Sequence, residues 1–316
     1  MEAILLYFCT LFGCAQKPAE SVDLYEEFIK NRGTKVENVV TVKQDEKEIK
    51  KLLSDLNKYA NRHEVDKILS LYDKNFISHD GFTLETYGKV LDDAFKYYKN
   101  IRTKSEIKHI FMKKDEAFVT LLDKSKATVY DDNDKFLSFK IKTLKTAFYE
   151  NECSYMLRLK KTREGWKIVS DHIIFETCMI RNLRAKDIPM LLTTPQTVEP
   201  GQEYTVKLDM DLGKNMGAMV DLSREVITWP STLFEEKYKV FPKTKTLERV
   251  IRANETGYNE NIAAYINIGE YSYLKKYNKY KIDTTGYAII SQRVNVKSDK
   301  RFLAMWNETK NVQNKR

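Results

Sequence analysis

The sequence predicts an α+β domain followed by an all-β domain, because apolar residues follow two different periods along the chain. Between residues 46 and 99 they recur at helical spacing, whereas from residue 105 onward β-branched and aromatic residues form strand-like runs between polar turns. After residue 186, prolines and turn signals introduce a second series of short alternating runs without an amphipathic helix. The chain is therefore expected to contain an α+β domain at 46–182 and a β-sandwich at 183–300.

Three helices and a short strand are expected to open the first domain. Residues 46–61, 64–74 and 84–99 carry apolar side chains every three to four positions, and Thr83 is a suitable N-cap for the third helix. Phe76–Phe82, which ends in an Asp-Gly turn, is predicted to be a strand. The helices are expected to cover one face of a sheet.

A long meander of strands should supply that sheet. The β-rich runs are 105–113, 116–130, 136–150, 152–161 and 166–177. The segments between them are short and polar, as in hairpin turns, so consecutive strands should pair antiparallel. Three helices over a curved antiparallel sheet would make an α+β fold.

This order of elements resembles the nuclear transport factor 2-like (SnoaL-like) superfamily, whose members form a cone-shaped α+β fold around a pocket. The resemblance is carried by the two opening helices, the Phe76–Phe82 segment and a closing Gly-Trp-Lys-Ile-Val-Ser-Asp-His segment at 165–172. It covers residues 46–178 and implies the fold. Enzymes of the superfamily place an aspartate or histidine inside the cone for proton transfer. If this chain is such an enzyme, the resemblance implies a residue of that kind.

Five residues occupy suitable positions for that role: His79, Asp80, His109, Asp171 and His172. His172 would form an acid/base pair with His79 or Asp80 if both side chains pointed inward. Asp80 also has a purely structural explanation as half of an Asp-Gly turn. Strand alternation leaves open whether Asp171 or His172 faces the cone. For ligand binding without chemistry, the candidates are His109, Asp171 and Trp166.

No cofactor or metal is expected. The histidines lack ligand spacing, no Cys-x-x-Cys occurs, and Asp131–Asp134 lacks the glycine and terminal glutamate of a calcium loop. Cys153 and Cys178 would lie on one hairpin that turns near Arg163-Glu164, with Cys153 opposite Ile174. Two buried free thiols are therefore favoured over a disulfide.

Residues 183–300 are expected to form the sandwich. Tyr204–Leu212 alternates between apolar and polar residues, and further strands are predicted at 224–229, 236–241, 246–253, 261–268, 277–282 and 286–296. Val198–Val206 resembles the first strands of immunoglobulin-like domains in bacterial surface proteins. Four tyrosines interleaved with lysines, at 271, 273, 277 and 280, either bind sugars or polyanions or pack within a strand and loop.

The N-terminus carries the clearest indication of location. Residues 1–14 form an apolar run that is too short to cross a bilayer. Leu11-Phe12-Gly13-Cys14 resembles the lipobox of a bacterial lipoprotein signal, although no lysine or arginine precedes the apolar run. The resemblance implies acylation of Cys14 and a place in the cell envelope, at the outer membrane if the host has two. Residues 15–45 then form a tether, and 301–316 form a polar basic tail.

The distribution of charge argues against a nucleic-acid-binding function. The net charge is +9, but the 54 Lys and Arg residues are spread along the chain, and no nucleic-acid recognition motif is present. We therefore expect a membrane-anchored envelope lipoprotein with a non-catalytic role in binding a ligand or protein. The alternatives are an isomerase- or dehydratase-like enzyme that uses the cone, and a cell-wall or glycan binder that uses the sandwich.

Overall fold

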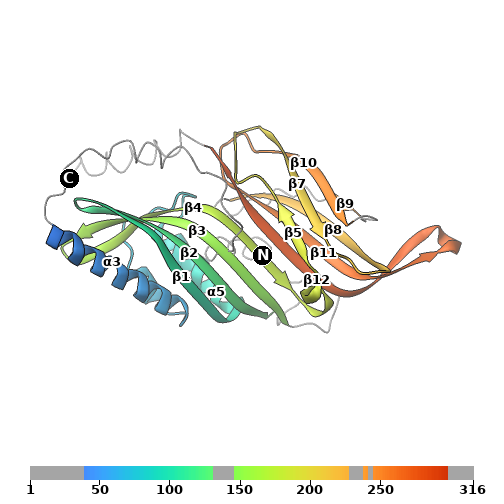
Figure 1. Cartoon of the computed structure of the whole chain (residues 1–316), viewed down its shortest axis with the longest axis horizontal. Helices are drawn as coiled ribbons and strands as arrows, with labels where there is room; N and C mark the ends of the chain where they lie inside the picture. The colour runs from blue at the N-terminus through green and yellow to red at the C-terminus, as the bar shows by residue number, and fades with distance from the viewer. Residues whose placement is uncertain (1–38, 131–145, 228–237, 241–244, 298–316) are drawn as a thin grey trace.

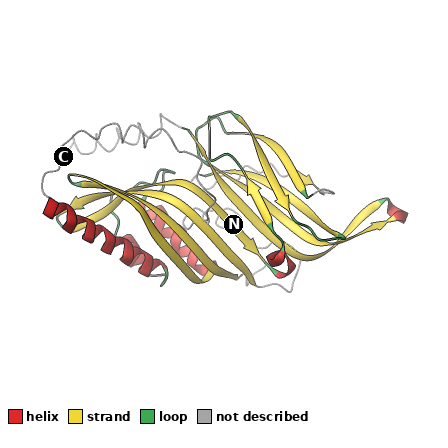
Figure 2. Ribbon diagram, in the orientation of Figure 1, coloured by secondary structure: helices red, strands yellow, loops and turns green. Residues whose placement is uncertain are grey.

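The structure, a computed structural model of the 316-residue chain, describes residues 39–130, 146–227, 238–240 and 245–297. The described residues form three α-helices, all in the N-terminal part, and twelve β-strands (Figures 1 and 2). Cys14, Asp131–Asp134 and the tail at 301–316 lie outside them, as do parts of the predicted tether and of three predicted strands. The chain is thus sheet-rich, as the α+β prediction requires.

The helices are α3 (Val39–Ala60), α4 (Val65–Leu69) and α5 (Leu84–Tyr97). Each buries apolar side chains, such as Ile49, Ile68 and Leu91, in one cluster shared with the sheet. The Thr83 hydroxyl accepts a hydrogen bond from the Thr86 amide at 3.3 Å, which confirms the predicted N-cap. Helix α3 begins at Val39 and not at residue 46, so the end of the expected tether is helical.

The segment predicted as a strand at Phe76–Phe82 does not become a strand of the sheet. It makes one isolated bridge, between Ile77 and Thr83. The amides of Ile77 and His79 donate to backbone carbonyls of the strand that carries residues 169 and 171, at 3.3 and 3.0 Å. This connection between α4 and α5 therefore runs along the sheet without joining its ladder.

The antiparallel meander contains four long strands where five were predicted: β1 (Tyr98–Lys113), β2 (Glu116–Tyr130), β3 (Thr146–Thr162) and β4 (Gly165–Arg181). The strand predicted at 152–161 and the described end of the one predicted at 136–150 are a single strand, β3. Consecutive strands pair antiparallel. Strand β1 starts directly after α5, earlier than the predicted residue 105. Helices α3 and α5 lie against this part of the sheet in Figure 1.

The C-terminal half adds eight strands: β5 (Met190–Thr193), β6 (Thr197–Val198), β7 (Glu203–Met210), β8 (Met216–Val226), β9 (Tyr238–Val240), β10 (Thr246–Arg252), β11 (Glu260–Leu274) and β12 (Lys279–Val296). A short 3-10 helix at Leu183–Asp187 connects the halves. The strands predicted at 277–282 and 286–296 are one strand, β12, whose pairing with β11 makes a long hairpin.

The two halves share one sheet. Residues 177–181 of β4 pair with residues 288–292 of β12, and the order is β1-β2-β3-β4-β12-β11-β8-β9, with β6 beside β12. A separate three-stranded sheet, β10-β7-β5, packs on the C-terminal strands through a second apolar cluster. Alternation along β12 serves both clusters: Tyr287 and Ile289 face the first, while Ala288 and Ile290 face the second. The predicted boundary at residue 182 is thus crossed by a continuous sheet.

Candidate functional site

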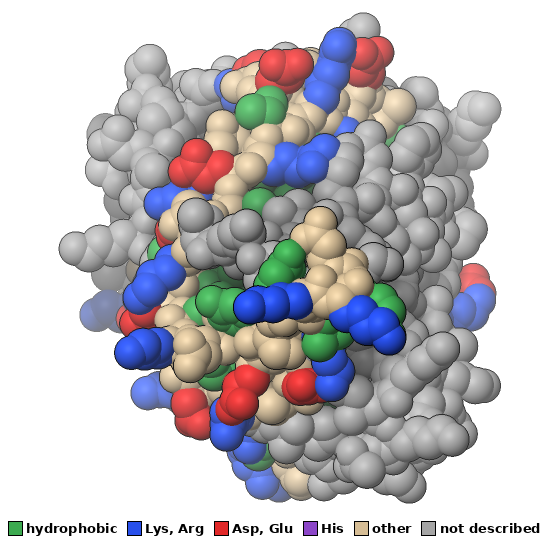
Figure 3. Space-filling model, turned by 90° about the vertical axis from the view of Figure 1, so that its right-hand side faces the viewer, with side chains coloured by type: hydrophobic (Ala, Val, Ile, Leu, Met, Phe, Trp, Pro, Cys, Tyr) green, Lys and Arg blue, Asp and Glu red, His purple; other side chains and the backbone are tan. Residues whose placement is uncertain are grey.

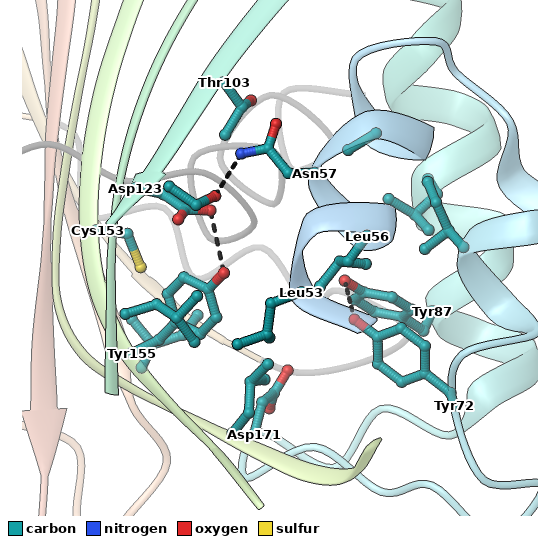
Figure 4. Close-up of a pocket in the computed structure, with 17 residues that line it drawn as sticks. Leu53, Leu56, Asn57, Tyr72, Tyr87, Thr103, Asp123, Cys153, Tyr155 and Asp171 are labelled. Carbon is teal, nitrogen blue, oxygen red and sulfur yellow. Dashed lines mark hydrogen bonds between the residues drawn. The ribbon is translucent and has the colours of Figure 1, made fainter. Parts of the chain in front are cut away.

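A small cavity lies between the helices and the β1–β4 part of the sheet (Figure 4). Its volume is about 50 Å³, against about 150 Å³ for a cavity that holds benzene, so it can accommodate water or a small organic group of a few heavy atoms. Its lining is Leu53, Leu56, Asn57, Ala60, Ile68, Tyr72, Tyr87, Leu91, Thr103, Ser105, Leu121, Asp123, Cys153, Tyr155, Leu157, Asp171 and Ile173. Two carboxyl groups and three phenols therefore face a largely apolar space, and no lining residue is basic.

Asp123 on β2 is the centre of one polar group. The Tyr155 hydroxyl donates to its carboxylate at 3.0 Å, and Ser105 also hydrogen-bonds to it. Ser105 Oγ lies 2.8 Å from the side-chain amide of Asn57, which comes from α3 (Figure 4). Burial raises the pKa of Asp123 to about 6, against the opposing effect of these hydrogen bonds. A strand and a helix thus meet through hydrogen bonds at this end of the cavity.

Asp171 on β4 is the second carboxyl group in the lining. Burial, assisted by the negative charge of Asp80, raises its pKa to about 7. Arg293 acts in the opposite direction. At neutral pH, Asp171 is therefore divided between its acid and carboxylate forms.

A pair of tyrosines forms the helical side of the lining. The Tyr72 and Tyr87 hydroxyl oxygens are 3.2 Å apart, and their rings are tilted with centroids at 5.2 Å (Figure 4). Burial raises the pKa of both phenols, so each keeps its proton. They present neutral hydroxyl groups opposite the sheet.

Two bulges decide which β4 residues face the cavity. The β3–β4 register shifts twice, and at each shift β4 contains one extra residue, Val169 or Ile174. After each extra residue, the alternate side chains that pointed to one face of the sheet point to the other. Trp166 consequently packs in the core that surrounds the cavity, while Asp171 lines the cavity itself. The question that alternation left open is resolved in favour of Asp171.

His79 and His172 do come together, but neither lines the cavity. Their rings meet edge to face with centroids 4.3 Å apart. Burial, with smaller contributions from His79 and Arg293, lowers the pKa of His172 to about 3, so its ring is neutral at physiological pH. His79 and His172 therefore contact each other as predicted, but they lie outside the cavity in which an acid/base pair would have to act.

Asp80 belongs to a buried ion pair. Its carboxylate accepts from Arg293 at 2.7 Å and from the Asn259 side-chain amide at 2.8 Å. The guanidinium holds the pKa of Asp80 at about 2, in spite of a burial effect in the opposite direction. A carboxylate held in its charged form by an arginine is a poor general base, so this geometry supports a structural role.

The remaining predicted site residues lie away from the cavity. His109 is exposed on β1. Trp166 is buried, and its indole N–H donates to Asp45 of α3 at 3.2 Å. His63, which is not among the predicted site residues, stacks on Phe95 with ring centroids 4.3 Å apart. The positions of Trp166 and His63 favour packing over ligand contact.

The sequence contained a signal for Asp123 that was overlooked. Ala117, Val119, Leu121, Asp123, Ser125, Ala127 and Val129 alternate along β2 and are all buried. An acidic residue in the middle of an inward-facing apolar series is a candidate for a perturbed functional group. Tyr72, Tyr87 and Tyr155 carry no comparable signal, because tyrosines are common in cores.

The two described cysteines do not bond to each other. Cys153 is a buried free thiol that pairs across the ladder with Glu176, and not with Ile174, because the bulges at Val169 and Ile174 together shift the register by two residues. Cys178 is opposite Asn151 and is disulfide-bonded to a partner other than Cys153. The expectation of two free thiols is therefore correct for Cys153 and wrong for Cys178.

The described residues contain neither a candidate metal centre nor a membrane-spanning helix. No group of three or more His, Cys, Asp or Glu side chains in this part of the chain is arranged to hold a metal ion. None of its helices has the length and apolar character needed to cross a membrane.

Comparison with known proteins gives weak similarities. No family model and no curated protein sequence matches the chain. Solved structures with local likeness include Bd1075 of Bdellovibrio bacteriovorus (12% identity, 40% of this chain, 39% of that chain, TM-score 0.31). An NTF2-like family protein of Streptomyces avermitilis has 15% identity over 42% of this chain and 96% of its own, with a TM-score of 0.30. A hexachlorocyclohexane dehydrochlorinase, LinA Type2, has 9% identity over 41% and 85%, with a TM-score of 0.32.

Proposed function

We propose that the cavity binds a small, mainly apolar ligand that carries a neutral or cationic hydrogen-bonding group. We further propose that the protein is an envelope lipoprotein with this binding role, and that residues 46–178 form a cone of the nuclear transport factor 2-like type. The observation that carries the ligand proposal is the lining itself, in which acids and phenols interrupt an apolar wall without any basic side chain.

The charge of the lining selects the ligand. Asp123 and Asp171, with pKa values of about 6 and 7, are both largely ionised at pH 8. A carboxylate ligand would meet like charges in a poorly solvated space, whereas an ammonium group would meet opposite ones. Hydroxyl or carbonyl ligands can use the phenols of Tyr72, Tyr87 and Tyr155. Anionic ligands are therefore the class that this cavity disfavours.

A matched set of probes tests the proposal on the full chain. Ethanol, ethylamine and acetate share a two-carbon frame small enough for the cavity and differ in charge, and saturation-transfer NMR at pH 8 reports their binding. We expect signals from the alcohol and the amine and none from acetate. Ala60→Leu, which adds side-chain volume to the lining, should reduce binding, while the exposed control Asp115→Asn should not. Equal signals from all three probes, or no effect of Ala60→Leu, would refute this site.

Binding of the amine should also depend on pH in a defined direction. Between pH 5 and pH 8 ethylamine stays cationic, while Asp123 and Asp171 lose their protons. Its affinity should therefore rise with pH, and Asp171→Asn should weaken the rise. The affinity of ethanol serves as the reference because this ligand has no charge.

Proton transfer is a second candidate function, favoured by Asp171 alone. A carboxyl group with a pKa near 7 in a cavity can act as a general acid or base. Asp171 would then take the place that His79, Asp80 and His172 were expected to fill. The test is deuterium uptake, in D₂O, at the carbon next to the carbonyl of small neutral ketones. Exchange that persists at the same rate in Asp171→Asn would exclude this role.

The lipoprotein part of the proposal rests on the Leu11–Cys14 motif. It is incompatible with a disulfide at Cys178 in the mature protein, because Cys9 would leave with the signal, Cys14 would carry the lipid and Cys153 is free. Metabolic labelling with a fatty-acid probe tests it directly. Label on the native protein that disappears in Cys14→Ser is the expected result. Label that is absent from the native protein, or that survives the substitution, would reject acylation at this residue.

A further inference from the structure

The β11–β12 hairpin extends beyond the body of the molecule and forms its projecting end in Figure 1. Strand β8 pairs with β11 only as far as Glu270, and β4 pairs with β12 only between residues 288 and 292. Residues 271–284 are therefore a two-stranded ribbon without a further strand partner in the described structure. Such a ribbon has two faces open to its surroundings.

Large apolar side chains gather at the end of this ribbon. Tyr271, Tyr273, Leu274 and Tyr277 are 42, 47, 39 and 60% exposed. They account for four of the nine large hydrophobic residues that are exposed in the described chain. A patch of this kind on one projecting element is typical of an interaction site.

The same tip is basic. Residues 271–284 contain four lysines and one acidic residue, Asp283, which forms an ion pair with Lys281 at 2.6 Å. Lys275 and Lys276 lie in the 3-10 turn η2 (Lys275–Tyr277) and are exposed, and the ammonium group of Lys276 is 5.3 Å from the Tyr277 ring centroid. Figure 3 looks onto this end of the molecule and shows basic and apolar side chains side by side. The tip thus combines positive charge with apolar surface.

The conformation of the tip is defined by local contacts. Asn278 adopts a left-handed conformation with φ of 49°, which closes the turn. The Tyr273 hydroxyl donates to the Asn278 side-chain carbonyl at 2.5 Å. The apolar and basic side chains are therefore presented together from a closed turn.

We propose that this tip docks on a lipid bilayer with anionic headgroups. Tyrosines are favoured at the level of the headgroups, where one end of the ring is apolar and the other is hydrated. Lysines next to the membrane are attracted by anionic lipids. Leu274 distinguishes a bilayer from a soluble glycan or nucleic acid, because an exposed aliphatic side chain gains most from acyl chains. The proposal does not depend on the cavity ligand or on acylation.

Vesicle sedimentation tests the proposal with the full chain in a Cys14→Ser background. We compare vesicles of phosphatidylcholine alone with vesicles that contain 30 mol% phosphatidylglycerol. Binding should be stronger to the anionic vesicles. The double variant Lys275→Gln/Lys276→Gln should lose roughly 30-fold in affinity, since each lysine near such a surface contributes roughly fivefold. Leu274→Ser/Tyr277→Ser should weaken binding as well.

A matched control uses the adjacent exposed lysines of another hairpin turn, as Lys113→Gln/Lys114→Gln. This pair carries the same change in net charge and should keep wild-type binding. Amide hydrogen exchange on anionic vesicles should slow within residues 271–282. The proposal is overturned if both lysine pairs behave alike or if anionic and neutral vesicles bind equally. It is also overturned if vesicles leave amide exchange at the tip unchanged while a soluble sulfated glycan binds there.

Discussion

Asp80 and Arg293 are 213 positions apart in the sequence and form a buried ion pair with a separation of 2.7 Å. Asp80 lies in the connection between α4 and α5, and Arg293 lies on β12. The Arg293 side chain is fully buried, and its Nε also donates to Asn295 at 2.8 Å. The pair therefore ties the connection beside the cavity to the C-terminal half of the sheet.

Removing one partner of this pair should be costly. Asp80→Ala leaves an arginine buried without its counter-charge, and such changes destabilise by about 3–5 kcal/mol. Chemical denaturation at pH 7 measures the loss. The double variant Asp80→Asn/Arg293→Met should recover a large part of it, because neither charge remains. A loss below about 1 kcal/mol in Asp80→Ala would contradict the structural role.

The pair also predicts how stability changes in acid. The pKa of Asp80 is about 2 in the folded protein, below its ordinary value of 3.8. Its contribution is therefore complete above pH 3.8 and is lost as pH falls towards 2. Denaturation between pH 4.5 and pH 2 should show a smaller loss of stability in Asp80→Asn than in the native chain.

Asp171 should have the opposite effect on the pH dependence. Its pKa is raised from 3.8 to about 7, so the folded protein holds the Asp171 proton more tightly than the unfolded chain does. The free energy of unfolding therefore falls as pH rises from 3.8 to about 7. Asp171→Asn should therefore stabilise the protein at pH 8, by up to about 4 kcal/mol, and change little at pH 3. Thermal unfolding at both values measures the difference. A destabilised variant at pH 8 would contradict the assignment.

Trp166 tests the contact between α3 and the sheet. Trp166→Phe keeps most of the apolar volume but removes the indole donor to Asp45. Asp45 keeps its ion pair with Lys161 at 2.5 Å, so the loss should be limited to about 1–2 kcal/mol. Trp166→Ala should cost about 3–5 kcal/mol, because it also leaves a cavity. Similar losses from both variants would show that the hydrogen bond dominates.

Gly286 tests the junction between the halves. A Cβ atom at this position in β12 would lie 2.7 Å from the backbone nitrogen of Ala185 in the connecting 3-10 helix. Because that atom belongs to the backbone, Gly286→Ala should shift the connection and destabilise the protein by about 1–3 kcal/mol. Gly213→Ala is the matched control, since its Cβ would meet only the Met216 side chain at 3.8 Å. Equal stability of the two variants would contradict this close approach.

Much of the N-terminal half could be predicted from local patterns. The helical spacing around Leu52 and Leu91, the cap at Thr83 and the order of the antiparallel meander depend on residues close in sequence. The Asp171 site could not be predicted in this way, because two one-residue bulges exchange the faces of β4. A bulge depends on the partner strand, so the alternation of one strand does not reveal it.

The sequence by itself determined which segments become helices and hairpins, because their hydrogen bonds and apolar spacing are local. Only the tertiary structure decided that β12 joins β4, that Arg293 meets Asp80 and that Asp123 and Asp171 share one cavity. These contacts join residues that are dozens to hundreds of positions apart. They form where the packing of two apolar clusters on one continuous sheet brings distant strands together.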